Sequence, residues 1–496
     1  MANRFLSRRT VLGGLLAGAG QSAWAGAPTT SLYPIARTEG VRQASIAAAD
    51  ALINKAGLGG KISLVVANAS DGKILESVNP LLALPPASVA KAITAQYALD
   101  ALGPEHNFST QLIAVGTIVA GRLEGDLVLM GGGDPTLDTT ALAEMAALLK
   151  ATGLREVSGR FLVQSGALPH VHQIDAGQPG HLGYNPAVSG LNLNYNRVHF
   201  EWKKNGGKYK VTMDARTAKY RPEVSLASMT VVDRRGPVFT YANGGQTERW
   251  TVAKSALGKG GSRWLPVRQP ELYAGEVFQI FARSHGLILK APSVGYGSHG
   301  GTVLVDRASP DLKLILKGML KHSNNLTAEV MGLSASVARG HTVSGLSPSA
   351  RQMSGWMETQ LGARRPRFVD HSGLGDKSRI TSLDMVKGMV SVGPNSILAG
   401  MLKPIQPRDG KGNLRLGSDI TLKAKTGTLN FVSGLSGFIN TGENKDLVFA
   451  IFSADTARRN DIALADRERP RGARSWSRRA RALQWALIDR WVDVYG

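Results

Sequence analysis

The sequence predicts an α+β fold in which a domain of helices and antiparallel strands is interrupted by a large, mainly β insert. Apolar and polar residues alternate near both ends of the chain, as in strands with one buried face. Helix-forming stretches lie between these strands, and a long central segment has mostly strand-like patterns. We expect a domain split into residues 26–105 and 296–496, around an insert at 106–295 that could hold two subdomains.

The first 25 residues have the pattern of a removable export signal. Three arginines lie within the first nine residues, an apolar run covers 11–19, and alanines stand at 23 and 25. The string Ser-Arg-Arg-Thr-Val-Leu at 7–12 favours the twin-arginine route. An ordinary secretory signal with two arginines by chance is the alternative. Either signal predicts a periplasmic location.

The first expected strand pair, 61–67 and 74–78, is joined by Ser70-Asp71-Gly72-Lys73. Asp-Gly between two apolar runs indicates a hairpin turn. The four residues also match Ser-x-x-Lys, in which a lysine can activate a serine nucleophile. A lysine directly after such a turn is usually a solvated side chain, so we expect no catalytic role for Ser70.

A second Ser-x-x-Lys, Ser88-Val89-Ala90-Lys91, opens an expected helix, because Pro85-Pro86 ends an extended segment and 87–99 is helix-forming. Residues three apart share a helix face, so the Lys91 amine can reach the Ser88 hydroxyl. The helix start also offers free N–H groups to a developing oxyanion. A serine that only caps the helix is the alternative. We predict Ser88 as nucleophile and Lys91 as its base.

The insert contains a local basic cluster together with two aromatic residues. Such a cluster could grip an anionic polymer, and a polar sheet face is the alternative. Glycine-rich stretches at 131–134 and 258–262 lack both the Walker spacing and a helix directly behind them, so neither predicts a phosphate loop. Strands are expected at 111–115, 117–119, 123–130, 198–202, 208–213 and 238–242. The cluster consists of Lys203, Lys204, Lys208, Lys210, Arg216, Lys219 and Arg221, with Trp202 and Tyr209.

Two further strings contain residue types that can work with a serine and a lysine. Ser323-Asn324-Asn325 lies between expected helices at 311–321 and 326–330, in a short connection whose side chains can face a cleft. Lys425-Thr426-Gly427-Thr428 ends an expected strand over 420–425, and an exposed edge lysine is the alternative. Strands at 432–440 and 446–453 and a final helix at 475–492 follow, with Leu483, Leu487 and Trp491 on one helix face.

Taken together, these strings resemble the penicillin-interacting serine enzymes. The chain is similar in particular to the D-alanyl-D-alanine carboxypeptidase/endopeptidase family, the class C low-molecular-mass penicillin-binding proteins of the penicillin-binding protein 4 type. The resemblance extends over roughly residues 41 to 455 and implies a split penicillin-binding-protein/β-lactamase-like catalytic domain. Besides the three strings, the matching segments are 84–91, 125–137, 191–197, 321–329, 370–374 and 423–429.

The resemblance implies a role for each candidate residue in cleaving the bond between two D-alanines of a peptidoglycan stem peptide. Ser88 forms the acyl-enzyme, neutral Lys91 takes its proton, and Ser323 relays that proton to the leaving amine. Asn325 holds Lys91 and the substrate amide. The terminal carboxylate is received by Lys425, Thr426 and Thr428, with Gly427 between them. The backbone N–H groups of Ser88 and Thr428 form the oxyanion hole.

Two rival functions remain at this point. A β-lactamase-like hydrolase has the same motifs and differs in how fast the acyl-enzyme is hydrolysed. A non-catalytic cell-wall-binding protein would keep the fold and bind through its basic insert, although the intact catalytic strings argue against it. The chain departs from the family at Gly375-Asp376, where Ser-Arg is common, so its recognition of the stem-peptide side chain is open.

The composition restricts the partners. A net charge of +22 attracts polyanions, and export argues against nucleic acid and for an anionic cell-wall or membrane surface. A basic surface that only favours solubility is the alternative. The sequence has no cysteine, which excludes disulfides and thiolate metal sites. The ten histidines form no spaced ligand set, so we expect no metal and no cofactor, with peptidoglycan peptides as substrates and β-lactam antibiotics as inhibitors.

Overall fold

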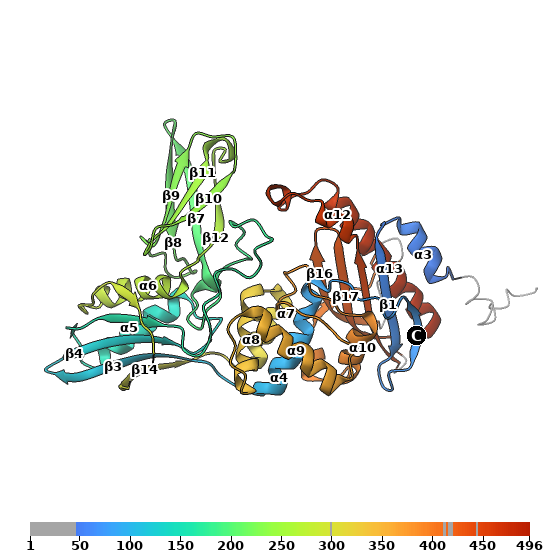
Figure 1. Cartoon of the computed structure of the whole chain (residues 1–496), viewed down its shortest axis with the longest axis horizontal. Helices are drawn as coiled ribbons and strands as arrows, with labels where there is room; N and C mark the ends of the chain where they lie inside the picture. The colour runs from blue at the N-terminus through green and yellow to red at the C-terminus, as the bar shows by residue number, and fades with distance from the viewer. Residues whose placement is uncertain (1–45, 298–299, 410–412, 415–419, 443–444) are drawn as a thin grey trace, which may run out of the picture. The chain divides into compact units, whose positions relative to one another are not determined.

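A six-stranded antiparallel sheet, here called the first sheet, combines strands from both ends of the chain (Figure 1). The computed structural model describes residues 46–297, 300–409, 413–414, 420–442 and 445–496, so the predicted export signal lies outside the described residues. The strand order is β15-β16-β17-β18-β1-β2, which places β1 directly beside β18. The strands are β15 (Lys403–Ile405), β16 (Thr421–Leu429), β17 (Val432–Asn440), β18 (Asp446–Ala454), β1 (Lys61–Asn68) and β2 (Ile74–Val78).

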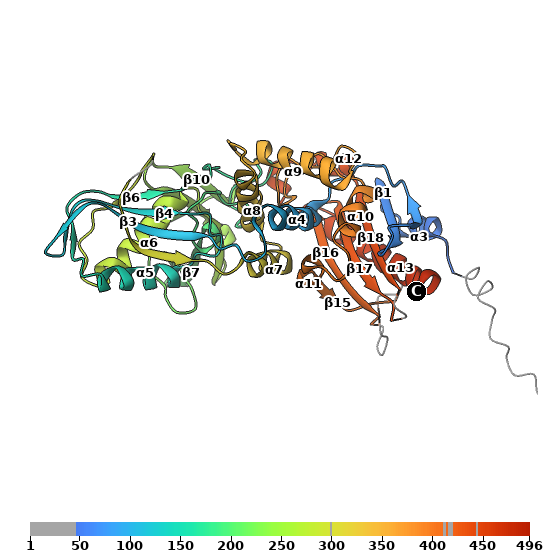
Figure 2. The same ribbon diagram turned by 90° about the horizontal axis from the view of Figure 1, so that it is seen from below.

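Helices cover both faces of the first sheet, because successive residues of its strands point to opposite sides (Figures 1 and 2). In β1, Leu64 and Val66 face the helices α3 (Ala49–Ala56) and α13 (Ala473–Tyr495), while Val65 and Ala67 face the other helices. The predicted apolar face of α13, with Leu483, Leu487 and Trp491, is buried there. On the other side lie α4 (Ala90–Leu102), α7 (Leu312–His322), α8 (Asn325–Ala338), α9 (Leu346–Leu361), α10 (Ser382–Val390) and α11 (Ile397–Met401).

The central helix of this layer is α4, and each of its residues from Ala90 to Ala98 is buried. Such a helix has no polar face, which agrees with its position between α8, α7 and the first sheet. It is preceded by the 3-10 turn η1 (Ala87–Val89), which contains Ser88. The predicted nucleophile therefore stands directly before a stretch of helix in which every residue is buried.

The predicted insert contains a second six-stranded sheet and two three-stranded sheets. The second sheet has the order β13-β6-β4-β3-β14, with β5 paired to β4, and the smaller sheets have the orders β12-β7-β8 and β10-β11-β9. Two helices that the sequence analysis did not predict, α5 (Thr139–Ala151) and α6 (Pro270–Ser284), pack against each other beside the second sheet. Strand β14 lies beyond residue 295, so the second sheet extends past the predicted end of the insert.

The strands of the second sheet are β3 (Ser109–Val119), β4 (Arg122–Gly131), β5 (Glu156–Val157), β6 (Phe161–Gln164), β13 (Pro292–Val294) and β14 (Thr302–Ala308). Those of the smaller sheets are β7 (Arg197–Asn205), β8 (Lys208–Asp214), β9 (Ala227–Val232), β10 (Phe239–Asn243), β11 (Glu248–Ala253) and β12 (Gly260–Pro266). The short helix α12 (Thr456–Asn460) and the 3-10 turns η2 (Asn194–Asn196), η3 (Lys254–Ala256) and η4 (Leu464–Asp466) complete the described elements. The two strands expected at 111–115 and 117–119 form the single strand β3.

Part of the predicted insert shares a hydrophobic core with the helices around α4. Leu168, Ile174 and Val188 are buried in the same cluster as Ile93 and Leu316. Packed side chains therefore connect the insert to the rest of the chain, in addition to the two points where the backbone enters and leaves the insert.

Candidate active site

Ser88 and Lys91 lie within hydrogen-bond distance of each other. The Lys91 Nζ is 2.9 Å from the Ser88 Oγ, because the 3-10 turn and the first turn of α4 bring residues three apart onto one face. The other Ser-x-x-Lys behaves differently. Ser70 lies in the turn between β1 and β2, and its hydroxyl donates to the side-chain oxygen of Asn68.

Lys91 is fully buried, and three oxygen atoms surround its amine. Besides the Ser88 Oγ, these are the Asn325 Oδ1 at 2.8 Å and the Ser372 carbonyl oxygen at 2.7 Å. The pKa of Lys91 is lowered well below its ordinary value, first by burial and then by the nearby charge of Lys425. The carboxyl groups of Glu329 and Asp370 oppose this shift.

The three contacts fit a neutral amine, which has two N–H bonds and one lone pair. The Asn325 Oδ1 and the Ser372 carbonyl can only accept hydrogen bonds, so they take the two N–H groups. The lone pair is then left for the Ser88 hydroxyl proton. The Asn325 Nδ2 donates to the Tyr184 carbonyl at 2.9 Å, and this fixes the side-chain oxygen toward Lys91. A neutral Lys91 in this arrangement could accept the Ser88 hydroxyl proton.

Two buried carboxyl groups hold the segment that presents the Ser372 carbonyl. Glu329, on α8, accepts hydrogen bonds from the backbone N–H groups of His371 and Ser372, at 2.9 and 2.8 Å. Asp370 accepts from the N–H groups of Gly373 and Gly375. Burial raises the pKa of Glu329 to about 8 and that of Asp370 to about 6.

The sequence analysis gave no role to Glu329 or Asp370, although both lie in segments that carry the family resemblance. A buried glutamate inside a helix and an aspartate in a loop have no local pattern that reveals their function. Only their position in segments that match the family could have pointed to a role for them.

Ser323 and Lys425 form a second linked pair. Ser323 ends α7 in the left-handed conformation, with φ of 55°, and so turns the chain toward α8. The Lys425 Nζ donates to the Ser323 Oγ at 3.0 Å and to the Thr426 carbonyl at 2.7 Å. Lys425 is buried rather than an exposed edge lysine, and burial lowers its pKa to about 8, with a further contribution from Lys403.

Gly427 allows β16 to approach the nucleophile. A Cβ at this position would stand 2.6 Å from the Pro86 carbonyl oxygen and 3.0 Å from the Ser88 backbone nitrogen. Among the described strands, only β15 pairs with the outer edge of β16, and it reaches no further than Ala424. The edge from Lys425 to Leu429 is therefore open to an extended peptide beside Ser88.

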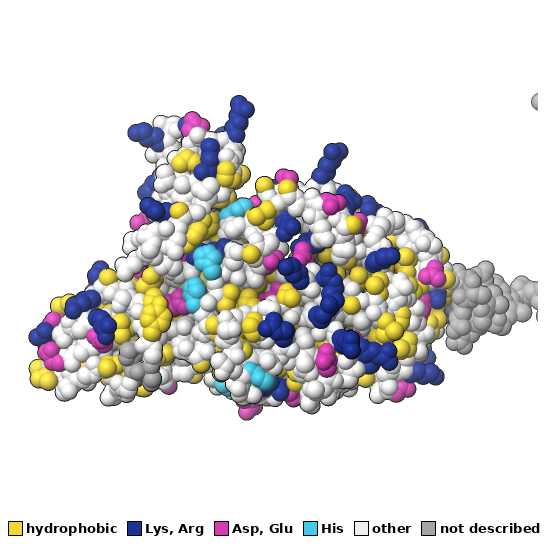
Figure 3. Space-filling model, in the orientation of Figure 1, with side chains coloured by type: hydrophobic (Ala, Val, Ile, Leu, Met, Phe, Trp, Pro, Cys, Tyr) yellow, Lys and Arg dark blue, Asp and Glu magenta, His cyan; other side chains and the backbone are white. Residues whose placement is uncertain are grey.

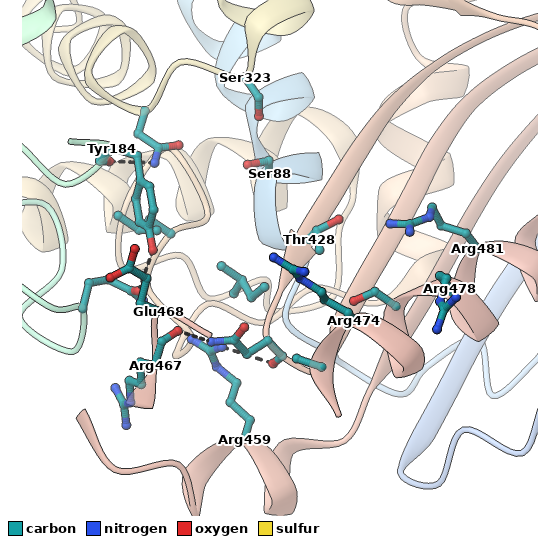
Figure 4. A pocket seen from close by; sticks show the side chains of 17 residues that line it. Ser88, Tyr184, Ser323, Thr428, Arg459, Arg467, Glu468, Arg474, Arg478 and Arg481 are labelled. Carbon is teal, nitrogen blue, oxygen red and sulfur yellow. Dashed lines mark hydrogen bonds between the residues drawn. The ribbon is translucent and has the colours of Figure 1, made fainter. Parts of the chain in front are cut away.

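A pocket of about 800 Å³ contains Ser88, Ser323, Asn325 and Thr428 (Figure 4). The predicted insert contributes Gln178 and Tyr184 to its wall. The segment after α12 contributes Arg467 and Glu468, which also contact the insert, since Glu468 lies 2.8 Å from the His181 Nε2 and 3.1 Å from the Arg263 Nη2. Sequence reasoning missed the arginines of this pocket, namely Arg459, Arg467, Arg474, Arg478 and Arg481.

The basic cluster predicted in the insert is only partly available to a ligand. Four lysines of the β7–β8 hairpin are exposed, and lysine and arginine side chains project from this part of the molecule in Figure 3. Arg216, in contrast, forms ion pairs with Asp214 and Glu201. The two aromatic residues donate to backbone carbonyls of the neighbouring loop, Trp202 to Leu257 and Tyr209 to Gly258, and so hold the hairpin in place.

No helix in the described ranges is long and apolar enough to cross a membrane. In the same ranges, no group of three or more histidine, cysteine, aspartate or glutamate residues could hold a metal ion.

Comparison with known families identifies the family of the chain. Residues 45–469 match the model of the D-Ala-D-Ala carboxypeptidase 3 (S13) peptidase family. The chain belongs to this family. It is accordingly a serine-type D-Ala-D-Ala carboxypeptidase with a penicillin-binding-protein fold.

Individual relatives agree with the family assignment. The chain is 27% identical over 444 residues to the D-alanyl-D-alanine carboxypeptidase of Actinomadura sp. (strain R39), covering 81% of this chain and 79% of that protein. It is 23% identical over 416 residues to the D-alanyl-D-alanine carboxypeptidase DacB of Haemophilus influenzae, covering 79% and 85%. The crystal structure of penicillin binding protein 4 (dacB) from Haemophilus influenzae has the same fold, with a TM-score of 0.71 at 19% identity over 89% of this chain and all of that chain.

Proposed function

We propose that this carboxypeptidase cleaves the terminal D-Ala-D-Ala bond of peptidoglycan stem peptides through an acyl-enzyme on Ser88. The single observation that carries the assignment of residues is the contact set of the buried Lys91 amine. Two pure acceptors each take an N–H group, and the nitrogen lies 2.9 Å from the Ser88 Oγ, so the neutral amine can present its lone pair to the Ser88 hydroxyl. A charged lysine in the same place would lack the capacity to accept a proton.

In the acylation step, the Ser88 Oγ attacks the carbonyl carbon of the penultimate D-alanine while Lys91 takes the hydroxyl proton. The backbone N–H groups of Ser88 and Thr428 stabilise the oxyanion that forms. Ser323, which accepts a hydrogen bond from Lys425, passes its hydroxyl proton to the amine of the departing D-alanine as the C–N bond breaks, and the proton held by Lys91 replaces it. Water then attacks the ester, and Ser88 is released in its original form.

The proposed substrate position follows from charge and from the free strand edge. The terminal carboxylate binds at Lys425, whose pKa of about 8 keeps it mostly charged at neutral pH, and at the hydroxyls of Thr426 and Thr428. The remaining peptide extends along the open edge of β16 toward Tyr184 and Glu468. The acyl side of the substrate therefore faces the predicted insert.

We also propose that β-lactams acylate Ser88, because their reactive amide and carboxylate suit the same nucleophile and the same cation. A solved structure of the Haemophilus influenzae penicillin binding protein 4 is complexed with a novel β-lactam, and it has this fold with a TM-score of 0.66 at 20% identity. Export through the predicted signal, a periplasmic location and attraction to an anionic wall or membrane surface complete the proposal, in line with the charge of +22.

Labelled penicillin tests the proposal and separates the rivals. A peptidase keeps the label for longer than the time of the assay, a β-lactamase-like hydrolase releases it rapidly, and a non-catalytic wall-binding protein never acquires it. We expect lasting label together with release of D-alanine from a pentapeptide. Absence of both activities in the folded protein would overturn the proposal.

A further inference from the structure

The loop that carries the Ser372 carbonyl is docked on the helix that carries Lys91. The Thr94 Oγ1 donates to the His371 carbonyl at 2.6 Å, and the Lys91 Nζ donates to the Ser372 carbonyl at 2.7 Å. Residues 91 and 94 are three apart in α4 and so share one face of this helix. Two consecutive carbonyl groups of the loop therefore meet the same helix face, and one of them holds the proposed base.

The side chain of His371 is inserted between α4, α8 and α9, which lie together in Figures 1 and 2. Its ring lies against Gly332 of α8, where a Cβ would stand 2.1 Å from the ring atoms Cγ and Nδ1. It stacks with the ring of Tyr97 of α4, with 6.4 Å between centroids and 8° between planes. Its Nε2 lies 2.8 Å from the Oγ of Ser349 of α9. Three packed helices therefore fix the start of the loop.

The surroundings of the ring assign its proton. Burial lowers the pKa of His371 to about 3, so the ring is neutral and has a single N–H group. The Nδ1 has no hydrogen-bond partner among the described residues, whereas the Nε2 has the Ser349 hydroxyl. Buried N–H groups are very rarely left without an acceptor. The proton is therefore on the Nε2, and His371 donates to Ser349.

Ser349 belongs to a hydrogen-bonded network that returns to α4. Its Oγ lies 2.8 Å from the Ser336 Oγ, and the Ser336 Oγ lies 3.1 Å from the Tyr97 hydroxyl. All four side chains of this network, His371 included, are completely buried. Buried and well-connected hydrogen bonds rigidify the core around them. The network thus connects the rigid interior of the helical layer to the loop that contacts Lys91.

We infer that His371 is a positioning residue for acylation, which keeps the Ser372 carbonyl against the Lys91 amine through its hydrogen bond with Ser349. This inference rests on the proposed role of Lys91 as the base. The Ser372 carbonyl takes one N–H group of the neutral amine and so orients the lone pair toward Ser88. The described residues that line the active-site pocket do not include His371, so His371 acts only through the loop.

Two amide variants separate this hydrogen bond from the burial of a polar side chain. Glutamine places its side-chain nitrogen near the position of the Nε2, whereas asparagine reaches only to the position of the unpartnered Nδ1. His371→Gln should therefore retain the donor to Ser349, and His371→Asn should lose it. Ser349→Ala removes the same bond from the other side and replaces His371→Asn if that variant does not fold.

Ser382→Ala is the matched control. Ser382 is as fully buried as Ser349, is hydrogen-bonded to the Ser63 hydroxyl at 2.7 Å, and lies in α10, outside the network. Its loss should therefore lower the melting temperature by a similar amount. Acylation should be unchanged, because the loop keeps its contact with Lys91.

The rate constant of acylation by penicillin is the first measurement, with the melting temperature as a check of folding. A displacement of about 1 Å can slow an enzyme about a hundredfold, so we expect His371→Asn and Ser349→Ala to be acylated about ten- to a hundredfold more slowly. His371→Gln should stay within about threefold of the wild type, because the donor is retained. Ser349→Ala should slow His371→Asn little further, because both changes remove the same bond.

The pH profile of acylation separates positioning from a loss of folded protein. A carbonyl acceptor stabilises the charged form of Lys91 more than the neutral form, so its withdrawal lowers the pKa of Lys91. The acid limb should therefore move to lower pH in His371→Asn while the plateau falls. The charged groups that face the amine are unchanged in this variant, namely Lys425 of β16, Glu329 of α8 and Asp370 of the loop.

Several results would overturn the inference. Acylation that Ser349→Ala leaves unchanged, or that both amide variants reduce equally, would show that the bond does not position the loop. A lower plateau with an unmoved limb would indicate a purely structural role for His371, and a limb that moves to higher pH would indicate that water reaches Lys91. If penicillin did not acylate the wild-type enzyme, the proposed function itself would fail, and this result is distinct from wild-type acylation that the variants leave unaltered.

Discussion

Lys91 is the residue on which the proposed chemistry depends, because it must be uncharged at the pH where the enzyme works. An amine that is neutral in this range needs surroundings that lower its pKa well below the ordinary value of a lysine. Full burial supplies the largest contribution, and repulsion from Lys425 adds to it. The site achieves this without a solvent contact for the amine, whose neighbours are the oxygens of Ser88, Asn325 and Ser372.

The contribution of Lys425 predicts a shift in the pH profile. Lys425→Gln removes a positive charge near Lys91 and so raises the pKa of Lys91. Because the base acts in its neutral form, the acid limb of kcat/KM for acylation should move to higher pH. Stopped-flow acylation by penicillin across the pH range measures this. A profile that only drops in height would leave Lys425 as a carboxylate receptor alone.

Glu329 predicts a pH-dependent contribution to stability. Its pKa of about 8 in the folded protein lies above the ordinary value of about 4.5, so the folded state binds the proton more tightly. The resulting stabilisation is complete below about pH 4.5 and is lost as the pH rises to about 8. Glu329→Gln cannot titrate and also gives up one acceptor for a buried backbone N–H group, which costs about 1–3 kcal/mol.

Chemical denaturation of wild type and Glu329→Gln at several pH values checks this expectation. The gap in free energy of unfolding between the two proteins should narrow as the pH rises from 5 to 8. A gap that stays constant or widens would show that Glu329 is ionised in the folded protein, in contradiction to its buried, proton-binding role.

At the scale of elements, the active site is assembled where β16 meets the 3-10 turn before α4. Strand β16 contributes Lys425, Thr426 and Thr428, and the turn contributes Ser88. Ser323 follows the end of α7, and Asn325 is the first residue of α8. Gly427 is the point of closest approach between strand and turn. The three strings, far apart in the sequence, act together because this contact is tight.

Gly427→Ala should therefore separate the nucleophile from the strand. The new methyl group would meet backbone atoms of Pro86 and Ser88, which cannot rotate away, and such overpacking costs about 1–3 kcal/mol. We expect acylation to fall at least tenfold, with a lower melting temperature. Gly355→Ala is the control, since this position in α9 has open space around it and should be neutral or stabilising. Normal acylation by Gly427→Ala would contradict the close contact.

The sequence predicted most strands of the first sheet and the final helix. Apart from the short strand β15, which was not predicted, the first-sheet strands and α13 lie within a few residues of the expected bounds. Helices α5 and α6 were missed because both lie in a segment in which strand-like patterns dominate. The candidate residues of the three strings were found from local spacing, whereas the positions of the pocket arginines and of the two buried carboxyl groups depend on tertiary packing that no local pattern encodes.

At the scale of the whole molecule, the predicted insert takes part in the site. The Tyr184 carbonyl holds Asn325, Glu468 contacts His181 and Arg263, and residues 168–188 contribute to the core around α4. We propose that the insert and the catalytic part fold together, and that the outer limit of the insert lies after β14 rather than at residue 295.

Deletion of residues 106–295 tests this proposal. The shortened chain would lose Leu168, Ile174 and Val188 from the core and leave Asn325 without the Tyr184 carbonyl. We expect no soluble protein that penicillin can label, as judged by expression, circular dichroism and labelling. A soluble, acylated core would show instead that the insert is an independent domain.

The most direct test of the whole account is to locate the covalent bond that penicillin forms. The acylated protein is digested and its peptides are mapped by mass spectrometry, alongside Ser88→Ala and Ser70→Ala variants. We predict the added mass on the peptide that contains Ser88. Ser88→Ala should acquire no label although it remains folded, because the substitution at the helix start lowers the folding stability by only about 1 kcal/mol. Ser70→Ala should be labelled fully. An adduct on any other residue, or label that persists in a folded Ser88→Ala protein, would contradict the assignment of Ser88 as the nucleophile.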